Sequence, residues 1–384
     1  VILPVIRRVM PTVIANEIMG VQPMTGPVGL AFALRYKYQS DSLGFDGMDG
    51  VANTRSNRPV AGPANGLELG YQLLDTRYTG TSSSRLSGDG GVDHLSSDFY
   101  MVDEDKGIAE ILSNYELTGR IPQVTISFEK TAVEAGTRRL AARWSTELEQ
   151  DLKNMNGLDI DNEIVNSMSY EIQAEIDREI IVRMLQTAWA AGSGNGYSKW
   201  YAASADARWL GERNRDLYAK ITVESGRMAV RNRRGAANFL IATPNVCAAL
   251  EMLSEFQPMS VTSNVNSQSV GIAKVGSIGG RYQVYRDTRT EAQYQTGKRT
   301  AQRLEYVLLG YKGAEFWDTG IVYCPYIPVM VQRTIGPNDF APRVGLMTRY
   351  GVVDHIFGAS LYYHLILVKG LSTAFSQQQT SVYL

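Results

Sequence analysis

The chain has 384 residues, 44% of them hydrophobic and 20% charged, which is the composition of a folded protein and excludes a largely disordered one. Its 38 Lys and Arg residues are balanced by 39 Asp and Glu residues, for a net charge of −1. Because a protein that holds nucleic acid by neutralising phosphates should be basic, this balance argues against DNA binding as the main activity. No apolar run in the sequence reaches the ~18–20 residues of a membrane span.

The first part of the chain lacks the pattern of a compact domain. Residues 1–34 are rich in proline, so we expect an arm that lies along another protein surface, with Arg7 and Arg8 in a subunit contact. Residues 31–38 and 67–74 alternate apolar and polar side chains as half-buried strands do. Since Gly- and Ser-rich stretches surround them, we predict a projecting hairpin that becomes ordered across a neighbouring subunit. Its predicted buried face consists of Leu67, Leu69, Tyr71 and Leu73.

Two helices are predicted in the middle of the chain. The first is expected to begin at a capping box formed by Thr131 and Glu134 and to end at Asn156-Gly157. The second is expected to begin near Asp159 or Asp161 and to end at Gly192. At ~1.5 Å per residue it would be roughly 45 Å long, a beam on which other elements can pack. Its apolar stripe repeats every four residues: Ile164, Met168, Ile172, Ile176, Ile180 and Met184.

The pattern after Gly192 is that of a mixed α/β module with a central sheet. A helix is predicted over 209–232, and a second one is predicted to follow Thr243-Pro244, where proline suits the first helical position. β-Branched and aromatic runs predict the strands 239–242, 281–286, 306–311, 321–331, 344–353 and 361–368.

Sequence motifs of catalysis or metal binding are absent. Neither His94, His355 nor His364 has a second ligand at metal-site spacing, and no nucleophile elbow or zinc-protease motif occurs. Cys247 and Cys324 lack CxxC spacing, so we expect buried free thiols and a reducing compartment. We therefore predict no cofactor, no metal and no enzyme activity.

One dense basic cluster occurs, at the predicted end of the 209–232 helix. Three interpretations stay open: cations stabilising a helix C-terminus, a subunit contact, or a contact with nucleic acid. The cluster consists of Arg227, Arg231, Arg233 and Arg234.

Several segments, in a constant order along the chain, resemble the major capsid proteins of T4-like tailed phages. The most specific are Leu3-Pro4-Val5-Ile6-Arg7-Arg8, Trp144-Ser145-Thr146-Glu147-Leu148, Gly280-Arg281-Tyr282-Gln283-Val284-Tyr285 and Asp318-Thr319-Gly320-Ile321-Val322-Tyr323. The resemblance extends from residue 3 to about residue 353. The family's maturation protease would explain why the chain begins at Val1. The T4 member carries a folded insertion in its extended loop, and the stretch here is too short and too rich in Gly and Ser for one.

The resemblance implies an α+β protein with the HK97-type capsid fold, which has a long spine helix, an extended β-hairpin loop, a peripheral domain and a mixed α/β axial domain. The expected parts are an N-terminal arm (1–34), the extended loop (35–128), the peripheral domain (129–199), the axial domain (200–350) and a returning C-terminal strand (351–384).

The resemblance also implies a function. Copies would assemble in the host bacterial cytoplasm, as hexameric and pentameric capsomers, into an icosahedral head that encloses double-stranded DNA without sequence specificity. Vertex, decoration and scaffold proteins are further expected partners, and no membrane is. Two alternatives are an encapsulin-like compartment shell and an α/β enzyme that uses the 200–350 module.

Overall fold

The computed structural model of the chain describes most of its C-terminal two thirds and a short N-terminal part. The described residues are 15–38, 124–202, 209–259, 272–287, 305–315, 317–356 and 358–371. They belong to two compact units, one made of residues 1–29 and 132–384 and the other of residues 30–131, and each is described by itself.

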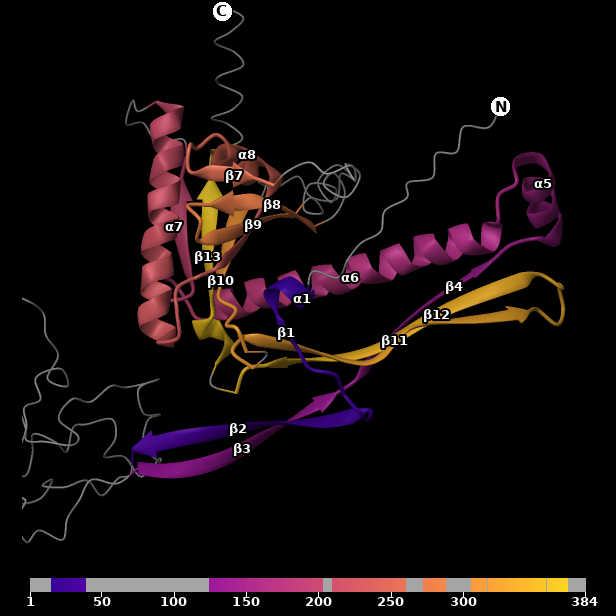
Figure 1. Cartoon of the computed structure of the whole chain (residues 1–384), viewed down its shortest axis with the longest axis horizontal. Coiled ribbons are helices and arrows are strands. Elements are labelled where there is room, and N and C mark those ends of the chain that lie inside the picture. The colour runs from indigo at the N-terminus through magenta and orange to yellow at the C-terminus, as the bar shows by residue number, and fades with distance from the viewer. Residues whose placement is uncertain are drawn as a thin grey trace, which may run out of the picture. The chain divides into compact units, whose positions relative to one another are not determined.

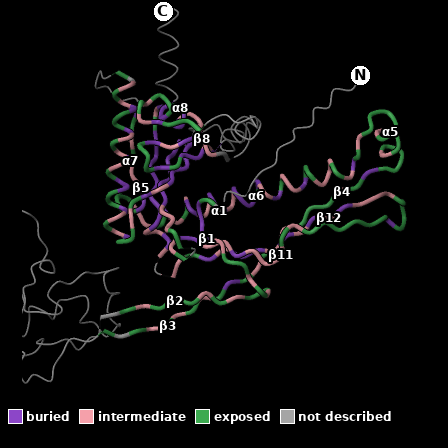
Figure 2. The backbone as a smooth tube through the Cα atoms, viewed as in Figure 1, coloured by how far each residue is buried: buried purple, intermediate pink, exposed green. Residues whose placement is uncertain are grey.

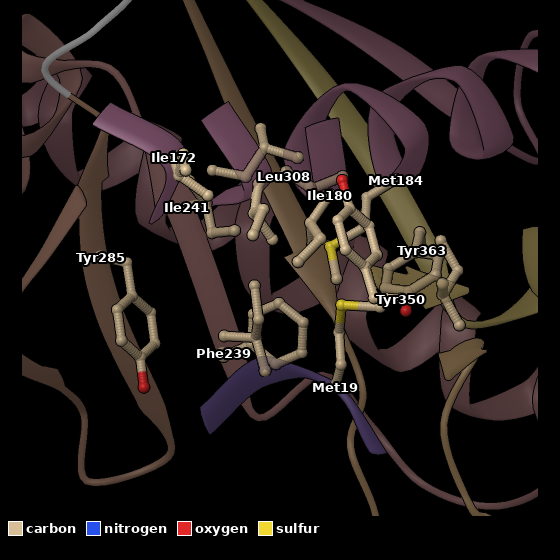
Figure 3. Close-up of a cluster of buried hydrophobic side chains, with 14 of the residues drawn as sticks. Met19, Ile172, Ile180, Met184, Phe239, Ile241, Tyr285, Leu308, Tyr350 and Tyr363 are labelled. Atoms are coloured by element: carbon tan, nitrogen blue, oxygen red, sulfur yellow. The ribbon is translucent and has the colours of Figure 1, made fainter. Parts of the chain in front are cut away.

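The first unit is built around the long helix α6 (Ile160–Ala190), which has 31 residues. It begins where Asp159 caps it: the Asp159 carboxylate accepts a hydrogen bond from the Asp161 amide. The predicted stripe is confirmed, because Ile172 and Ile176 are each 2% exposed and Ile180 and Met184 are fully buried. Figure 3 shows Ile172, Ile180 and Met184 next to apolar residues of the neighbouring sheets, such as Ile241 and Leu308.

A seven-stranded mixed sheet forms the α/β part of this unit, in the order β5-β13-β10-β6-β9-β8-β7. β5 pairs parallel with β13, and β6 pairs parallel with β9, whereas the other pairs are antiparallel. The strands are β5 (Tyr197–Tyr201), β6 (Phe239–Ala242), β7 (Phe256–Pro258), β8 (Ile272–Ile278), β9 (Tyr282–Asp287), β10 (Glu305–Gly310) and β13 (Tyr363–Lys369).

The sheet is covered on both faces. Because successive side chains of a strand point to opposite faces, Tyr306 and Leu308 of β10 join the core that contains α6, whereas Val307 and Leu309 join a second core. That second core contains Leu217 of α7 (Leu210–Asn232) together with residues of α8 (Pro244–Glu251). These two helices and the strands between them confirm the predicted mixed α/β module.

A buried ion pair joins α6 to the sheet. Asp287 at the end of β9 has no exposed side-chain surface, and its carboxylate lies 2.7 Å from Arg178 Nη1 on α6. The Tyr306 hydroxyl donates a second hydrogen bond to the same carboxylate, at 2.6 Å. A buried charge needs such partners, so these contacts fix the position of the helix on the sheet.

A four-stranded sheet lies along α6, in the order β1-β11-β12-β4. Its strands are β1 (Gly20–Val21), β11 (Ile321–Ile335), β12 (Pro342–Asp354) and β4 (Gly136–Arg143). The prediction grouped residues 321–350 with the α/β module, but both strands pair outside the seven-stranded sheet. The physical reason is their pairing, since β12 bonds to β11 on one side and to β4 on the other. The remaining short elements are α1 (Ala15–Ile18), α5 (Thr146–Asn156) and η3 (Ala359–Leu361).

The prediction of a helix beginning at Thr131 was wrong for its first half. Residues up to Glu134 belong to the strand β3 (Val124–Glu134), and β4 follows almost at once. The helix α5 begins only at Thr146, where the Ser145 hydroxyl accepts a hydrogen bond from the Leu148 amide. Strand pairing of β4 with β12 satisfies the backbone that the predicted helix would have satisfied internally.

The described part of the second unit is a two-stranded ribbon formed by β2 (Val28–Tyr38) and β3 (Val124–Glu134), which run in opposite directions. The strand predicted over 31–38 is confirmed. The predicted strand 67–74 lies outside the described residues.

Candidate subunit interface

One face of the ribbon formed by β2 and β3 is apolar and exposed. Phe32 of β2 is 57% exposed, and Ile126 and Phe128 of β3 are 63% and 68% exposed. All of these residues occupy even positions, so they share one face of the strands. Figure 2 shows the green, exposed stretches along both strands. The full set of large apolar side chains on this face within the second unit is Leu30, Phe32, Leu34, Tyr36, Val124, Ile126 and Phe128.

Contacts between the two strands hold this face in one arrangement. The Phe32 and Phe128 rings stack, with centroids 5.1 Å apart and planes 18° from parallel. On the opposite face, Arg35 Nη1 donates a hydrogen bond of 3.0 Å to Glu129 Oε2. Cross-strand pairs of these two kinds each stabilise a ribbon by ~0.2–1 kcal/mol. The apolar face is therefore presented as an ordered row.

A two-stranded ribbon has no core of its own and is at best marginally stable alone in water. Large contiguous apolar patches on soluble proteins mark interaction sites. Covering a side chain of this size completely contributes ~1.5–3 kcal/mol, so even half of that gain at each of the positions would stabilise an association strongly. The arrangement suits the apolar half of a protein–protein interface.

Of the residues predicted to form a subunit interface, Arg7, Arg8, Leu67, Leu69, Tyr71 and Leu73 lie outside the described residues. The four arginines of the basic cluster are described, at the end of α7, and their environments differ. Arg227 is exposed and pairs with Glu224 of the preceding turn, at 3.1 Å.

Arg231 faces inward. Its Nη2 lies 3.3 Å from Nδ1 of His364, whose side chain is fully buried on β13. Burial lowers the pKa of His364, and the same Nδ1 also lies 3.3 Å from the carbonyl oxygen of Asn195. Burial alone would raise the pKa of the buried Glu224, but the hydrogen bond from Lys220 and the charges around it lower that pKa. Arg231 thus belongs to an internal polar cluster, and its role as a cation at the helix C-terminus stays a prediction.

Arg233 and Arg234 follow the helix. Arg233 closes α7 in the left-handed conformation, with φ 51°, and is exposed. The Arg234 guanidinium lies 5.5 Å from the centre of the Trp317 ring, and 4.0 Å separate its Nε from Asp318 Oδ1. The structure therefore does not bring the four arginines together as one surface, and a subunit contact through Arg227, Arg233 and Arg234 stays a prediction.

A polar network ties the four-stranded sheet to α6 on its outer side. Arg138 of β4 donates to the Tyr350 hydroxyl at 2.6 Å and to Glu175 at 2.9 Å, and it also donates to Glu179. The Tyr350 hydroxyl in turn donates to Glu179. Burial would raise the pKa of Glu179, but the hydrogen bonds from Tyr350 and Arg138 hold that pKa below its usual value. Such a network gives the long helix and sheet a fixed mutual position.

Within the ranges that the structure describes, no three His, Cys, Asp or Glu side chains are placed to hold a metal ion. Likewise, the described helices include none that is long and apolar enough to cross a membrane.

The fold defines the class of the protein. The structure is similar to that of Mycobacterium phage Bobi, with a TM-score of 0.51 at 10% identity over 96% of this chain and 94% of that one. Together with the long helix, the ribbon and the two sheets, this similarity establishes the HK97-type capsid fold.

Sequence comparison then gives the family. The model of the major capsid protein Gp23 matches residues 1–381. The major capsid protein of Serratia phage KSP90 is 32% identical over 93% of this chain and 77% of its own length, and that of Enterobacteria phage T4 is 28% identical over 94% and 75%. The chain belongs to the Gp23 family of major capsid proteins, which form the head shell of tailed phages.

The apolar face of the ribbon was missed as an interface at the sequence level. The signal was present, because residues 31–38 alternate as the predicted strand requires. What the pattern could not reveal is that, among the residues that the structure describes in the second unit, no other element covers this face.

Proposed function

We propose that the ribbon formed by β2 and β3 lies across a neighbouring copy of the chain, which covers its exposed apolar face. The single observation that carries this proposal is the row of exposed apolar side chains around Phe32 and Phe128. Membership in a family that assembles shells from its own copies supports a second copy as the partner.

The parts of the chain take the roles expected for this fold. Residues 1–34 act as an N-terminal arm and 35–128 as the extended loop. Residues 129–199 form the peripheral domain with the spine helix, and 351–384 the returning strand. Residues 200–350 supply the axial domain, except that β11 and β12 join the four-stranded sheet along the spine helix. The compact unit 30–131 coincides closely with the extended loop, which supports the first boundary.

Copies assemble in the host cytoplasm as rings of six in the shell faces and rings of five at the vertices, since head-to-tail contacts that close make rings. Vertex, decoration and scaffold proteins are the further partners. The near-neutral charge supports a shell that encloses double-stranded DNA without holding it by phosphate neutralisation. The chain catalyses no reaction and carries no metal or cofactor of its own.

The test replaces both rings of the stack. In Phe32→Asp/Phe128→Asp, a neighbouring copy would have to cover two charges, each of which costs several kcal/mol to bury unpaired, so we expect soluble subunits and no closed particles. The matched control is Phe32→Leu/Phe128→Leu, which keeps the face apolar and should still give particles.

The measurement is size-exclusion chromatography followed by negative-stain imaging, with thermal melting of the isolated subunits. Because both positions are exposed in the single chain, the aspartate variant should melt as the wild type does. Closed particles from the aspartate variant would show that the neighbouring copy binds elsewhere.

A further inference from the structure

A polar cavity opens beside β7, β8 and β9 in the first unit, with a volume of about 610 Å³. The lining residues include Glu17 of α1, Lys274 of β8 and Phe239 of β6. Lys312, which follows β10, and Arg281, in the turn before β9, complete its charged lining. Lys274 and Phe239 belong to strands of the same seven-stranded sheet.

The cavity carries more positive than negative charge. Lys274, Arg281 and Lys312 line it together with a single carboxylate, that of Glu17. Glu17 already accepts a hydrogen bond of 2.7 Å from the Tyr285 hydroxyl. Within the described part of the chain, neither Lys274 nor Arg281 forms an ion pair. Burial lowers the pKa of Lys312, and the nearby Glu17 carboxylate raises it. Lys274 and Arg281 would attract an anionic ligand to the cavity.

The lining residues also indicate which class of anion the cavity can bind. Phe239, Pro258 and Met259 give the cavity an apolar side next to the cations. A segment that combines apolar side chains with adjacent carboxylates would match both parts. The sequence holds one run of three consecutive acidic residues, Asp103-Glu104-Asp105, and it directly follows Phe99-Tyr100-Met101-Val102.

We propose that this cavity binds the acidic segment 99–105 of a second copy of the chain. The chain as a whole is almost neutral, so a cationic cavity on one copy and an acidic segment on the next attract each other without overall repulsion between copies. The contact is head-to-tail, the kind that closes into rings. The proposal deepens the proposed function, on which it rests, by naming a specific partner for the extended loop.

Charge reversal on each side tests the pairing. We expect Lys274→Glu/Arg281→Glu to lower the fraction of assembled protein by about tenfold or more, since close interfacial charge pairs are worth at least that much. Asp103→Lys/Glu104→Lys should do the same. A chain that carries all four changes restores the opposite charges across the contact and should recover assembly to within about threefold of the wild type. The matched control is Lys199→Glu, an exposed lysine of β5 with the same change of charge.

A peptide measurement keeps the test independent of assembly. A fluorescent peptide of residues 98–106 should bind the full-length subunit and should be released by salt. The same peptide with Asp103→Asn, Glu104→Gln and Asp105→Asn should bind about tenfold more weakly. It should bind the Lys274→Glu/Arg281→Glu subunit equally weakly, with unchanged melting of that subunit.

Disulfide trapping identifies the copy that supplies the segment. In Lys274→Cys/Glu104→Cys, oxidation should give a ladder of covalently linked chains on a non-reducing gel. A cross-linked band at the size of one chain would overturn the second copy as the partner. Failure of the four-residue swap, or equal binding of both peptides, would overturn the pairing itself. Either result leaves the ribbon proposal intact if wild-type particles form and Phe32→Asp/Phe128→Asp prevents them.

Discussion

The helix α6 and the ribbon formed by β2 and β3 are both rich in large apolar residues, but they use them in opposite ways. Ile172 of α6 is 2% exposed, whereas Phe128 of β3 is 68% exposed. The helix lies against two sheets of its own chain, whereas the described residues of the second unit provide no such cover for the ribbon. Both regions therefore have one apolar face. In α6 this face stabilises the subunit itself, and in the ribbon it is available to a partner.

A substitution at Ile172 tests most directly whether the buried face of α6 stabilises the subunit. In Ile172→Asp, the carboxylate would be buried in the core without a partner, so we expect the free energy of unfolding to fall by about 3–5 kcal/mol. Urea unfolding of the isolated subunit measures this loss. The control is Asn166→Asp, at an exposed position of the same helix, which should stay within about 0.5 kcal/mol of the wild type. Normal melting and normal particles from Ile172→Asp would mean that the buried stripe contributes little.

The outer network of α6 should make the subunit less stable in acid. The pKa of Glu179 is held low in the folded state, so its stabilising contribution is present above the unfolded value of ~4.3 and is lost as the pH falls through the folded value. In Glu179→Gln this contribution is absent at every pH. Because the carboxylate is partly exposed, we expect a loss of only about 1 kcal/mol near pH 7.

Unfolding should therefore be compared at pH 6.5 and pH 3.5. The difference between wild type and Glu179→Gln should shrink at the lower pH. Glu175→Gln is the control, since Glu175 contacts the same arginine but has a side chain that is 49% exposed. An unchanged difference at both pH values would show that Glu179 does not carry the acid sensitivity.

A smaller change in stability tests where the strand ends and the helix α5 begins. Ser145 caps α5, so Ser145→Ala should lower the free energy of unfolding by about 1 kcal/mol. Thr131 lies in a strand, and Thr131→Val, a β-branched replacement, should change it by less than about 0.5 kcal/mol. The opposite order in urea unfolding would favour the capping box that the sequence suggested.

The sequence predicted a segment correctly where the contacts that fix its structure are close in sequence. The helix α6 was predictable because its cap at Asp159 and its four-residue stripe are local features. β4 was not, because Leu140 and Trp144 fit a helical spacing and the strand that it pairs with lies about two hundred residues away. For the ribbon, the alternation of residues 31–38 predicted a strand. Whether Phe32 faces a core or a partner depends on what covers it in three dimensions.

A substitution on the apolar face of the ribbon should change the stability of the free subunit very little. The solvent exposure of the same position should change strongly on assembly. Leu34→Cys places a thiol on the exposed apolar face and should leave the unfolding free energy within about 0.5 kcal/mol of the wild type. The native thiols give little background, because both are buried and burial raises the pKa of Cys247 to about 12, far from the reactive thiolate. Labelling with a thiol reagent should be fast in subunits and about tenfold or more slower in particles, as expected when a contact excludes solvent. Dissociating the particles should restore fast labelling, which excludes oxidation as the cause. Equal rates in both states would show that a neighbouring copy leaves this face uncovered, and the ribbon would then differ from α6 in exposure alone.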